Sequence, residues 1–271
     1  MKRNCLEIVR QKCESCNGCA LGATRNNIVF SDGNASTARI VLIGEAPGET
    51  EDMTGRPFVG RAGQLLTEFL TEAGISRDRD VYIINTVKCR PPENRVPTDE
   101  EKSACRKFLD AQIDIIKPDA IVLCGATALK SFVTLDKKQT ISKIRGQWMT
   151  VTVDGVEYKA ITIFHPSYLL RNHSLEEGSP RRLMQEDLKN IKETILPDTD
   201  GSTAGIVSFE DLLGDVATVI ANRIEFNIYD TLMNSNQVPE YNTTQTEDTM
   251  EAFGQFVIAA QESFKGNAGA G

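Results

Sequence analysis

The stretch IVLIGEAPGETEDMTGRPFVG, residues 40–60, decides the fold. It opens with four consecutive apolar residues, Ile40 to Ile43, a pattern typical of a strand buried on both faces of a parallel sheet. Gly44 and three further glycines follow, and such loops often bind phosphate, yet this one also carries three glutamates, an aspartate and Phe58. The loop is therefore expected to bind a ligand that needs close backbone approach, carboxylates and an aromatic face together.

The chain to about residue 196 continues this alternation of strands and helices. Further strands are expected at 81–89, at 119–125 and in a hairpin through Asp154-Gly155 that ends at His165. Helices are expected at 63–74, at 98–117 with Thr98 as N-cap, at 126–133 and at 180–196. The pattern predicts a three-layer α/β/α fold with a mainly parallel central sheet, whose ligands bind beyond the carboxyl ends of the strands. Those ends fall at Gly44, Asn85, Gly125 and His165.

Charge is distributed unevenly along the 271 residues. The whole chain has a net charge of −8, but residues 198–271 alone carry 12 acidic and two basic side chains. We therefore expect a domain at 1–197 and an acidic C-terminal extension at 198–271, mostly helical but disordered at its end, which would pack on the domain or bind a protein partner. No apolar run reaches the roughly 18 residues of a membrane span, and the N-terminus lacks the apolar core of a secretory signal. A cytoplasmic protein with no membrane contact is expected.

Five of the seven cysteines have a spacing typical of a metal site. They are Cys13, Cys16, Cys19, Cys89 and Cys105. Four thiolates from two distant segments can hold zinc or a [4Fe-4S] cluster, and the spacing does not choose between them. The alternative is a scatter of buried thiols, which is the expectation for Cys5 and Cys124.

Three motifs, in this order, resemble the family 4 iron–sulfur uracil-DNA glycosylases. They are GEAPGETEDMTGRPFVGRAGQLL at 44–66, INTVKCRPPENRVPT at 84–98 and FHPSYLLR at 164–171. The likeness extends from about residue 16 to residue 188. It implies the three-layer fold of those enzymes, a [4Fe-4S] cluster and a monofunctional glycosylase that starts base-excision repair by removing uracil from DNA.

The resemblance implies Cys16, Cys19, Cys89 and Cys105 as the cluster ligands. The spacing from Cys19 to Arg25 fits the family when Cys16 and Cys19 form the N-terminal pair. Cys13 is then an extra thiol, and a pair made of Cys13 and Cys16 is the alternative.

The resemblance also implies a pocket for a uracil base flipped out of DNA. Phe58 would stack on the base, and the Asn85 amide would bond both O4 and N3–H, which cytosine does not match. Glu45, Ala46 and Pro47 would line the same pocket.

Catalysis is expected to depend on His165, Glu45 and Glu51. The histidine would donate a hydrogen bond to uracil O2, and a carboxylate would orient water or stabilise the sugar cation. Ala46 stands where the best-known uracil-DNA glycosylases carry an aspartate, which leaves both glutamates as candidates. Asp52 is expected to be a solvated loop charge.

DNA contact is expected from two segments. Leu169 and Leu170 would fill the space that the flipped base leaves, and Arg171, Lys88 and Arg90 would bind phosphates. The expected substrate is uracil-containing DNA, single- or double-stranded, bound by a monomer. The rival functions are a non-catalytic uracil-sensing or DNA-binding module, tethered to a replication partner by the acidic extension, and a nucleotide-binding enzyme. The second rival lacks the GKS/T and GxGxxG signatures.

Overall fold

A computed structural model of the chain describes residues 2–136 and 139–197, and the acidic extension predicted at 198–271 lies outside these residues. The helices are α1 (Lys2–Glu14), α2 (Glu49–Thr54), α3 (Arg61–Glu72), α4 (Asp99–Ile116), α5 (Ala126–Lys130), α6 (Ile141–Ile144), α7 (Pro166–Leu169) and α8 (Pro180–Ile195). The strands are β1 (Asp32–Gly33), β2 (Ile40–Gly44), β3 (Val81–Asn85), β4 (Ala120–Cys124), β5 (Trp148–Val153) and β6 (Val156–Ile163). Two short 3₁₀ helices cover Ala20–Ala23 and Pro92–Asn94.

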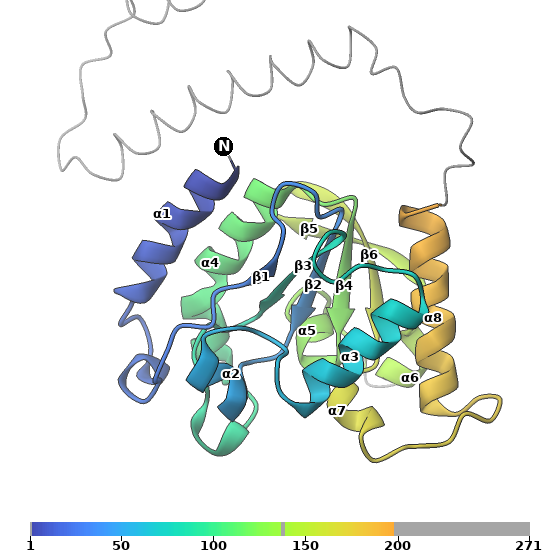
Figure 1. Cartoon of the computed structure of the whole chain (residues 1–271). Helices are drawn as coiled ribbons and strands as arrows, with labels where there is room; N and C mark the ends of the chain where they lie inside the picture. The colour runs from blue at the N-terminus through green and yellow to red at the C-terminus, as the bar shows by residue number, and fades with distance from the viewer. Residues whose placement is uncertain (1, 137–138, 198–271) are drawn as a thin grey trace, which may run out of the picture. The chain divides into compact units, whose positions relative to one another are not determined.

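The strands form one sheet in the order β1-β3-β2-β4-β6-β5 (Figure 1). β3, β2, β4 and β6 run parallel, and the antiparallel strands β1 and β5 close the two edges. All residues of β2, β3 and β4 are buried. A parallel sheet with helices on both faces requires such continuous apolar strands, so the predicted fold class is confirmed.

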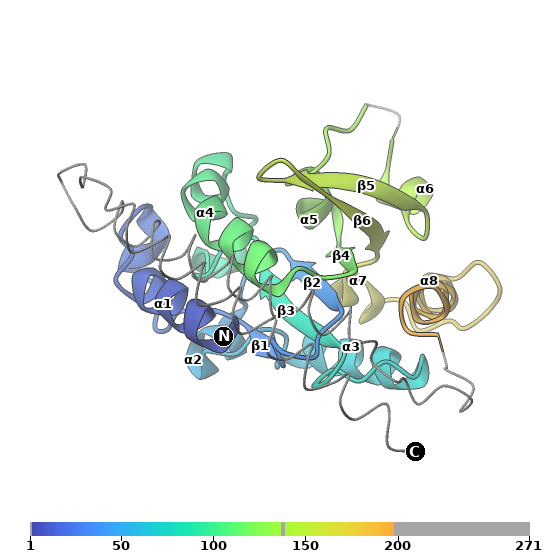
Figure 2. The same cartoon turned by 90° about the horizontal axis from the view of Figure 1, so that it is seen from above.

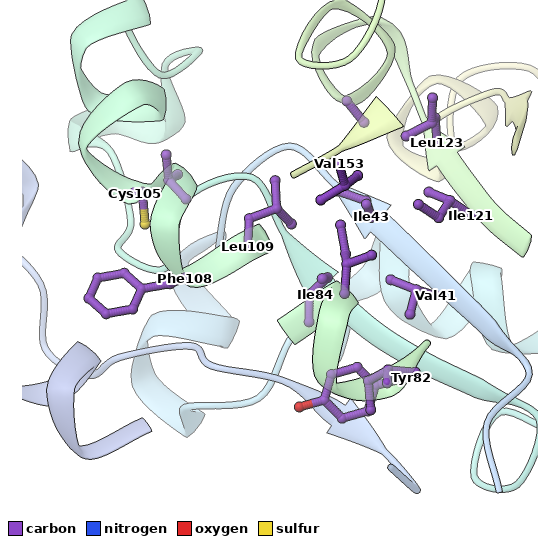
Figure 3. Close-up of a cluster of buried hydrophobic side chains, with 14 of the residues drawn as sticks. Val41, Ile43, Tyr82, Ile84, Cys105, Phe108, Leu109, Ile121, Leu123 and Val153 are labelled. Carbon is purple, nitrogen blue, oxygen red and sulfur yellow. The ribbon is translucent and has the colours of Figure 1, made fainter. Parts of the chain in front are cut away.

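Helices cover both faces of the sheet, as Figure 2 shows in a view from above. On one face α1, α4 and α5 pack over Val41 and Ile43, together with side chains from the neighbouring strands (Figure 3). On the other face α3, α7 and α8 pack over Ile40 and Leu42. Alternate residues of β2 therefore enter two separate cores, and the polar loops are left to gather at the strand ends.

The helix predicted at 98–117 begins with the expected cap. The Thr98 hydroxyl accepts a hydrogen bond from the Glu101 N–H at 3.3 Å, and the Glu101 carboxylate accepts one from the Thr98 N–H at 2.8 Å. This capping box satisfies two backbone donors and fixes the start of α4.

Three expectations for secondary structure were wrong. The helix predicted at 126–133 ends at Lys130, with Ser131 as its C-cap. The strand predicted at 81–89 ends at Asn85, because the Thr86 N–H turns to the Gly44 carbonyl oxygen (3.0 Å) instead of continuing the ladder. Residues 49–54, expected as loop, form α2, which ends at Gly55 in the left-handed conformation (φ 71°). No described helix is both long and apolar enough to cross a membrane.

Candidate functional site

Gly44 and Asn85 end neighbouring strands and lie opposite each other in the sheet. A Cβ atom on Gly44 would stand 2.4 Å from Asn85 Oδ1 and 2.5 Å from two ring atoms of Phe58. Glycine is therefore required here because the asparagine amide and the phenylalanine ring both approach the bare backbone. The structure thus brings the predicted stacking residue and the predicted amide to one point at the end of β2.

Phe58 has a strained backbone that its neighbours hold in place. Its φ is +53°, a left-handed conformation that is uncommon for aromatic residues. Its backbone lies directly over Gly63, where a Cβ would come within 1.9 Å of the Phe58 carbonyl oxygen. Glu51 Oε1 accepts hydrogen bonds from the next two backbone amides, Val59 N–H at 2.9 Å and Gly60 N–H at 2.7 Å. The Glu51 carboxylate thus fixes the turn that presents the ring.

Asn85 has an acceptor that is ready for a ligand. Its side chain is 1% exposed, and within the described residues its Oδ1 is buried without a hydrogen-bond partner. An unpaired buried polar atom costs about 1–3 kcal/mol, so this atom is expected to find its partner in a bound molecule. Lys88 Nζ donates to the Asn85 carbonyl oxygen at 2.9 Å and steadies the backbone from behind.

His165 lies beside this pair, with its ring centroid 5.7 Å from that of Phe58. It is the N-cap of α7, where the Ser167 N–H donates to Nδ1 at 3.3 Å and the Ser167 hydroxyl lies 2.8 Å from the same nitrogen. Because a backbone N–H can only donate, Nδ1 must accept, so the proton of the neutral ring is on Nε2. Burial lowers the pKa of His165, although the charges of Glu45 and Glu51 act in the opposite direction. The ring is therefore a neutral donor near pH 7.

Glu45 follows Gly44 directly and is partly buried. Its Oε2 accepts a hydrogen bond from the Thr127 hydroxyl, at the start of α5, and its carbonyl oxygen accepts one from the Thr86 hydroxyl. Ala46 and Pro47 continue the loop, partly buried and buried respectively. The Glu45 carboxylate is thus oriented by Thr127 and lies close enough to His165 for its charge to counter the burial that lowers the pKa of that histidine, whereas the carboxylate of Glu51 is engaged by backbone amides.

Five cysteines line one small cavity between the end of α1, the segment after β3 and α4. They are Cys13, Cys16, Cys19, Cys89 and Cys105. Cys13, Cys89 and Cys105 are buried, and Cys16 and Cys19 are partly buried. Cys124 is buried in the sheet as expected, whereas Cys5 is only partly buried. The structure therefore brings the whole predicted ligand set together and adds Cys13 to it.

The cavity carries donors that suit thiolate sulfur. Arg25 Nη1 donates to Cys89 Sγ at 3.4 Å, and the Gly18 N–H donates to Cys16 Sγ at the same distance. Burial raises the pKa of the Cys105 thiol to about 11, and the nearby Lys88 ammonium acts in the opposite direction. Among the described residues, no group of three His, Cys, Asp or Glu side chains is placed to hold a single metal ion. The ligands of a cluster surround several irons and lie farther apart, so this finding does not conflict with a cluster.

Three expectations about polar and DNA-contacting residues were wrong. Lys88 cannot bind a DNA phosphate, because it is 0% exposed and its ammonium lies in the cysteine cavity. Leu169 cannot fill a gap in the DNA stack, because it is 0% exposed and its side chain, at the end of α7, packs into the hydrophobic core. Asp52 is not a solvated charge: it is 1% exposed and accepts hydrogen bonds from the Asn26 N–H at 3.0 Å and the Asn27 N–H at 3.3 Å.

The other residues expected to contact DNA remain accessible. Leu170 is partly buried and Arg171 is exposed at the end of α7. Arg90 has a side chain 22% exposed, and its Nε donates to Asn94 Oδ1 at 2.8 Å. Tyr168, between the histidine and these residues, is 49% exposed.

Sequence reasoning missed two supporting residues, Thr127 and Ser167. Ser167 carried a usable signal, because a proline directly after His165 is typical of the first position of a helix and makes the histidine its cap. Thr127 carried none, because 82 residues separate it from Glu45 and only the parallel pairing of β2 with β4 brings the two together.

Known proteins are similar in sequence to most of the described part of this chain. The family model "Uracil DNA glycosylase superfamily" matches residues 30–189. A Type-4 uracil-DNA glycosylase of Thermotoga maritima is 54% identical over 191 residues, which cover 70% of this chain and 94% of the relative. Type-4 uracil-DNA glycosylases of Archaeoglobus fulgidus and Saccharolobus solfataricus are 42% and 39% identical, and the matches cover 69% and 70% of this chain and 91% and 86% of the relatives. The chain belongs to the uracil-DNA glycosylase superfamily, and within it to the type-4 family.

Proposed function

We propose that this chain is a monofunctional uracil-DNA glycosylase, which flips uracil out of DNA and hydrolyses its N-glycosidic bond at the start of base-excision repair. The observation that carries the proposal is the buried, unpartnered Oδ1 of Asn85, flanked by the Phe58 ring and close to the neutral His165. The type-4 relatives, similar over most of their length, support the same activity.

Uracil selectivity follows from the Asn85 amide. Its Oδ1 would accept the uracil N3–H, and its Nδ2 would donate to O4. Cytosine offers an unprotonated N3 and an amine at these two positions, so both contacts would be mismatched. Because each buried polar group left unpaired costs about 1–3 kcal/mol, a fixed amide discriminates strongly. The Lys88 contact to the Asn85 carbonyl oxygen supports this fixation from behind.

Catalysis follows from His165. When the bond between uracil N1 and sugar C1′ breaks, its electron pair remains on the base, and negative charge develops at O2. The neutral imidazole would donate its Nε2–H to O2 and stabilise that charge, the role of an oxyanion donor. The Ser167 amide keeps Nδ1 an acceptor and so holds the proton at the nitrogen that faces away from α7.

The two glutamates are proposed to differ in role. A water oxygen must form the new bond to C1′ and lose a proton, and Glu45, oriented by Thr127, is the carboxylate available to orient that water. Glu51 Oε1 already accepts two backbone amides, so we assign Glu51 to positioning Phe58. The product would be an abasic site with an uncut strand. The buried Lys88 offers no amine to the sugar, since its ammonium is bound to the Asn85 carbonyl oxygen.

DNA contact is proposed for the exposed end of α7 and for Arg90. Arg171 and Arg90 would bind phosphates, and Leu170 with Tyr168 would support the bases next to the vacated position. The protein is proposed to act as a monomer on single- or double-stranded DNA, and a protein partner for residues 198–271 stays a proposal, as does a cytoplasmic location.

A [4Fe-4S] cluster is the cofactor that the cysteine cavity supports best. Its proposed ligands are Cys16, Cys19, Cys89 and Cys105, and when bound it would tie the N-terminal segment to α4 and to the strand that carries Asn85. Arg25 and the Gly18 N–H donate hydrogen bonds to cysteine sulfurs, and the buried Lys88 ammonium adds a positive charge nearby. Such donors and charge stabilise four negatively charged thiolates better than they stabilise neutral thiols. Iron and sulfide analysis of anaerobically purified protein tests this, and zinc alone would refute it.

The rival function, a uracil-sensing module without catalysis, shares the pocket but needs no oriented histidine. An oligonucleotide with one uracil separates the two. The glycosylase releases free uracil and leaves a strand that breaks only after alkali, whereas the module binds the oligonucleotide and leaves it alkali-stable. Release of cytosine from the matched oligonucleotide at a similar rate would refute the role of Asn85.

A further inference from the structure

The cysteine cavity holds one thiol more than a four-ligand cluster needs. Cys13 lies in the last turn of α1, is 1% exposed, and lines the cavity with the four proposed ligands. The Cys16 N–H donates to the Cys13 carbonyl oxygen at 3.1 Å, so the two residues share one tight turn at the end of the helix. Cys13 is therefore part of the cavity wall and not a thiol buried elsewhere in the core.

Three of the five thiols form a common group. Cys19, at the start of the short helix Ala20–Ala23, lines the cavity together with Cys89 and Cys105. These three come from three separate segments of the chain, the N-terminal loop, the segment after β3, and α4.

Two thiols, Cys13 and Cys16, are available for the fourth ligand position of the proposed cluster. Cys13 and Cys16, which share the turn at the end of α1, both line the same cavity. Cys16 is partly buried, whereas Cys13 is buried. Each of the two thiols thus faces the group of three, one from the surface and one from the interior.

We infer that Cys13 and Cys16 are interchangeable fourth ligands of the cluster, so that the cavity is a five-thiol site. This inference rests on the proposed cluster. In the exchange one Fe–S bond to Cys16 breaks and one to Cys13 forms, while Cys13 gives its proton to solvent and Cys16 takes one up. No electron is transferred. The consequence is that loss or modification of the more exposed thiol leaves the cluster in place.

Iron and sulfide per chain, with absorbance near 400 nm, test the inference in anaerobically purified full-length variants. Cys16→Ala and Cys13→Ala should each keep the wild-type iron content. The double variant Cys13→Ala/Cys16→Ala should lose the cluster, and so should the matched control Cys89→Ala, because Cys89 comes from the segment after β3 and does not share a turn with Cys13 as Cys16 does. Loss of iron from Cys16→Ala as complete as that from Cys89→Ala would overturn the inference, and so would retention of iron by the double variant.

A second measurement needs no substitution. If the ligands exchange, iodoacetamide should alkylate Cys16 of the loaded wild-type protein, detected by peptide mass, while the 400 nm absorbance persists. Alkylation of Cys16 only in step with loss of that absorbance would overturn the inference. A wild-type protein without iron would instead contradict the proposed cluster, so the two failures are distinguishable.

Discussion

Replacing Gly44 by alanine tests the geometry of the proposed uracil pocket most severely. The added methyl group would lie 2.4 Å from Asn85 Oδ1 and 2.5 Å from the Phe58 ring, far inside van der Waals contact. Neither neighbour can retreat easily, because Asn85 is held by its strand and by Lys88, and the Phe58 turn is held by Glu51. The variant is expected to displace the amide, the ring or both.

The expected magnitude follows from the cost of overpacking. Forcing a methyl group into a filled site costs typically about 1–3 kcal/mol. If the strain falls on the residues proposed to contact uracil, kcat/KM decreases by about 5-fold to about 150-fold, since each 1.4 kcal/mol is worth a factor of 10. If the strain is instead taken up by the rest of the fold, it lowers the free energy of unfolding by the same amount, about 1–3 kcal/mol.

Single-turnover uracil release and thermal unfolding, measured on the same samples, separate these effects. Gly33→Ala is the matched control, because its Cβ would meet the Val81 carbonyl oxygen at 2.1 Å in the edge strand β1, away from the pocket. We expect the control to lose stability but to keep its rate per folded molecule. A Gly44→Ala enzyme with wild-type kcat/KM would refute the geometry argued for Phe58 and Asn85.

Further expectations concern the three polar side chains of the site. His165→Ala should slow bond cleavage by about 100-fold or more, which is the scale of one oxyanion donor. Asn85→Ala should lower both the rate and the preference for uracil over cytosine. Wild-type rates in both variants would show that the site is elsewhere. Glu51→Gln keeps an oxygen that can accept the Val59 and Gly60 amides, so it should keep most of the activity that Glu51→Ala loses; equal loss in both would show that the negative charge itself is needed. Because burial lowers the pKa of His165, the unfolded chain binds more protons than the folded one below about pH 6.5, so the free energy of unfolding should fall as the pH decreases through that value. Chemical denaturation between pH 8 and 5.5 checks this, and His165→Gln should lack that component of the pH dependence. An identical profile would contradict the lowered pKa of His165.

How much the sequence could predict depended on whether the signal was local. The buried strands, the Thr98 cap and the alignment of Gly44, Asn85 and His165 at the strand ends follow from periodicity, capping rules and parallel pairing. Lys88 was misassigned because a lysine in a polar loop is ordinarily solvated, and only the tertiary structure shows that it is buried and lines the cysteine cavity. Leu169 was misassigned because the motif FHPSYLLR does not indicate which leucine of a single helical turn faces the core.

The separate roles proposed for Glu45 and Glu51 also depended on the structure. Both belong to the same loop motif, and sequence alone offers two carboxylates of equal standing. Their hydrogen bonds distinguish them. Glu45 accepts a hydrogen bond from Thr127, which is distant in the chain, and Glu51 accepts hydrogen bonds from the Val59 and Gly60 amides in the turn after α2. Long-range contacts of this kind have no periodic signature in the chain.

The most direct test of the central claim is single-turnover release of free uracil from an oligonucleotide with one uracil, set against the same oligonucleotide with cytosine at that position. The iron-loaded wild-type protein should release uracil, leave an alkali-sensitive but uncut strand, and release no cytosine. Asn85→Ala should lose much of that difference between the two bases. A loaded, folded wild-type protein that binds the uracil oligonucleotide and releases no base would contradict the account.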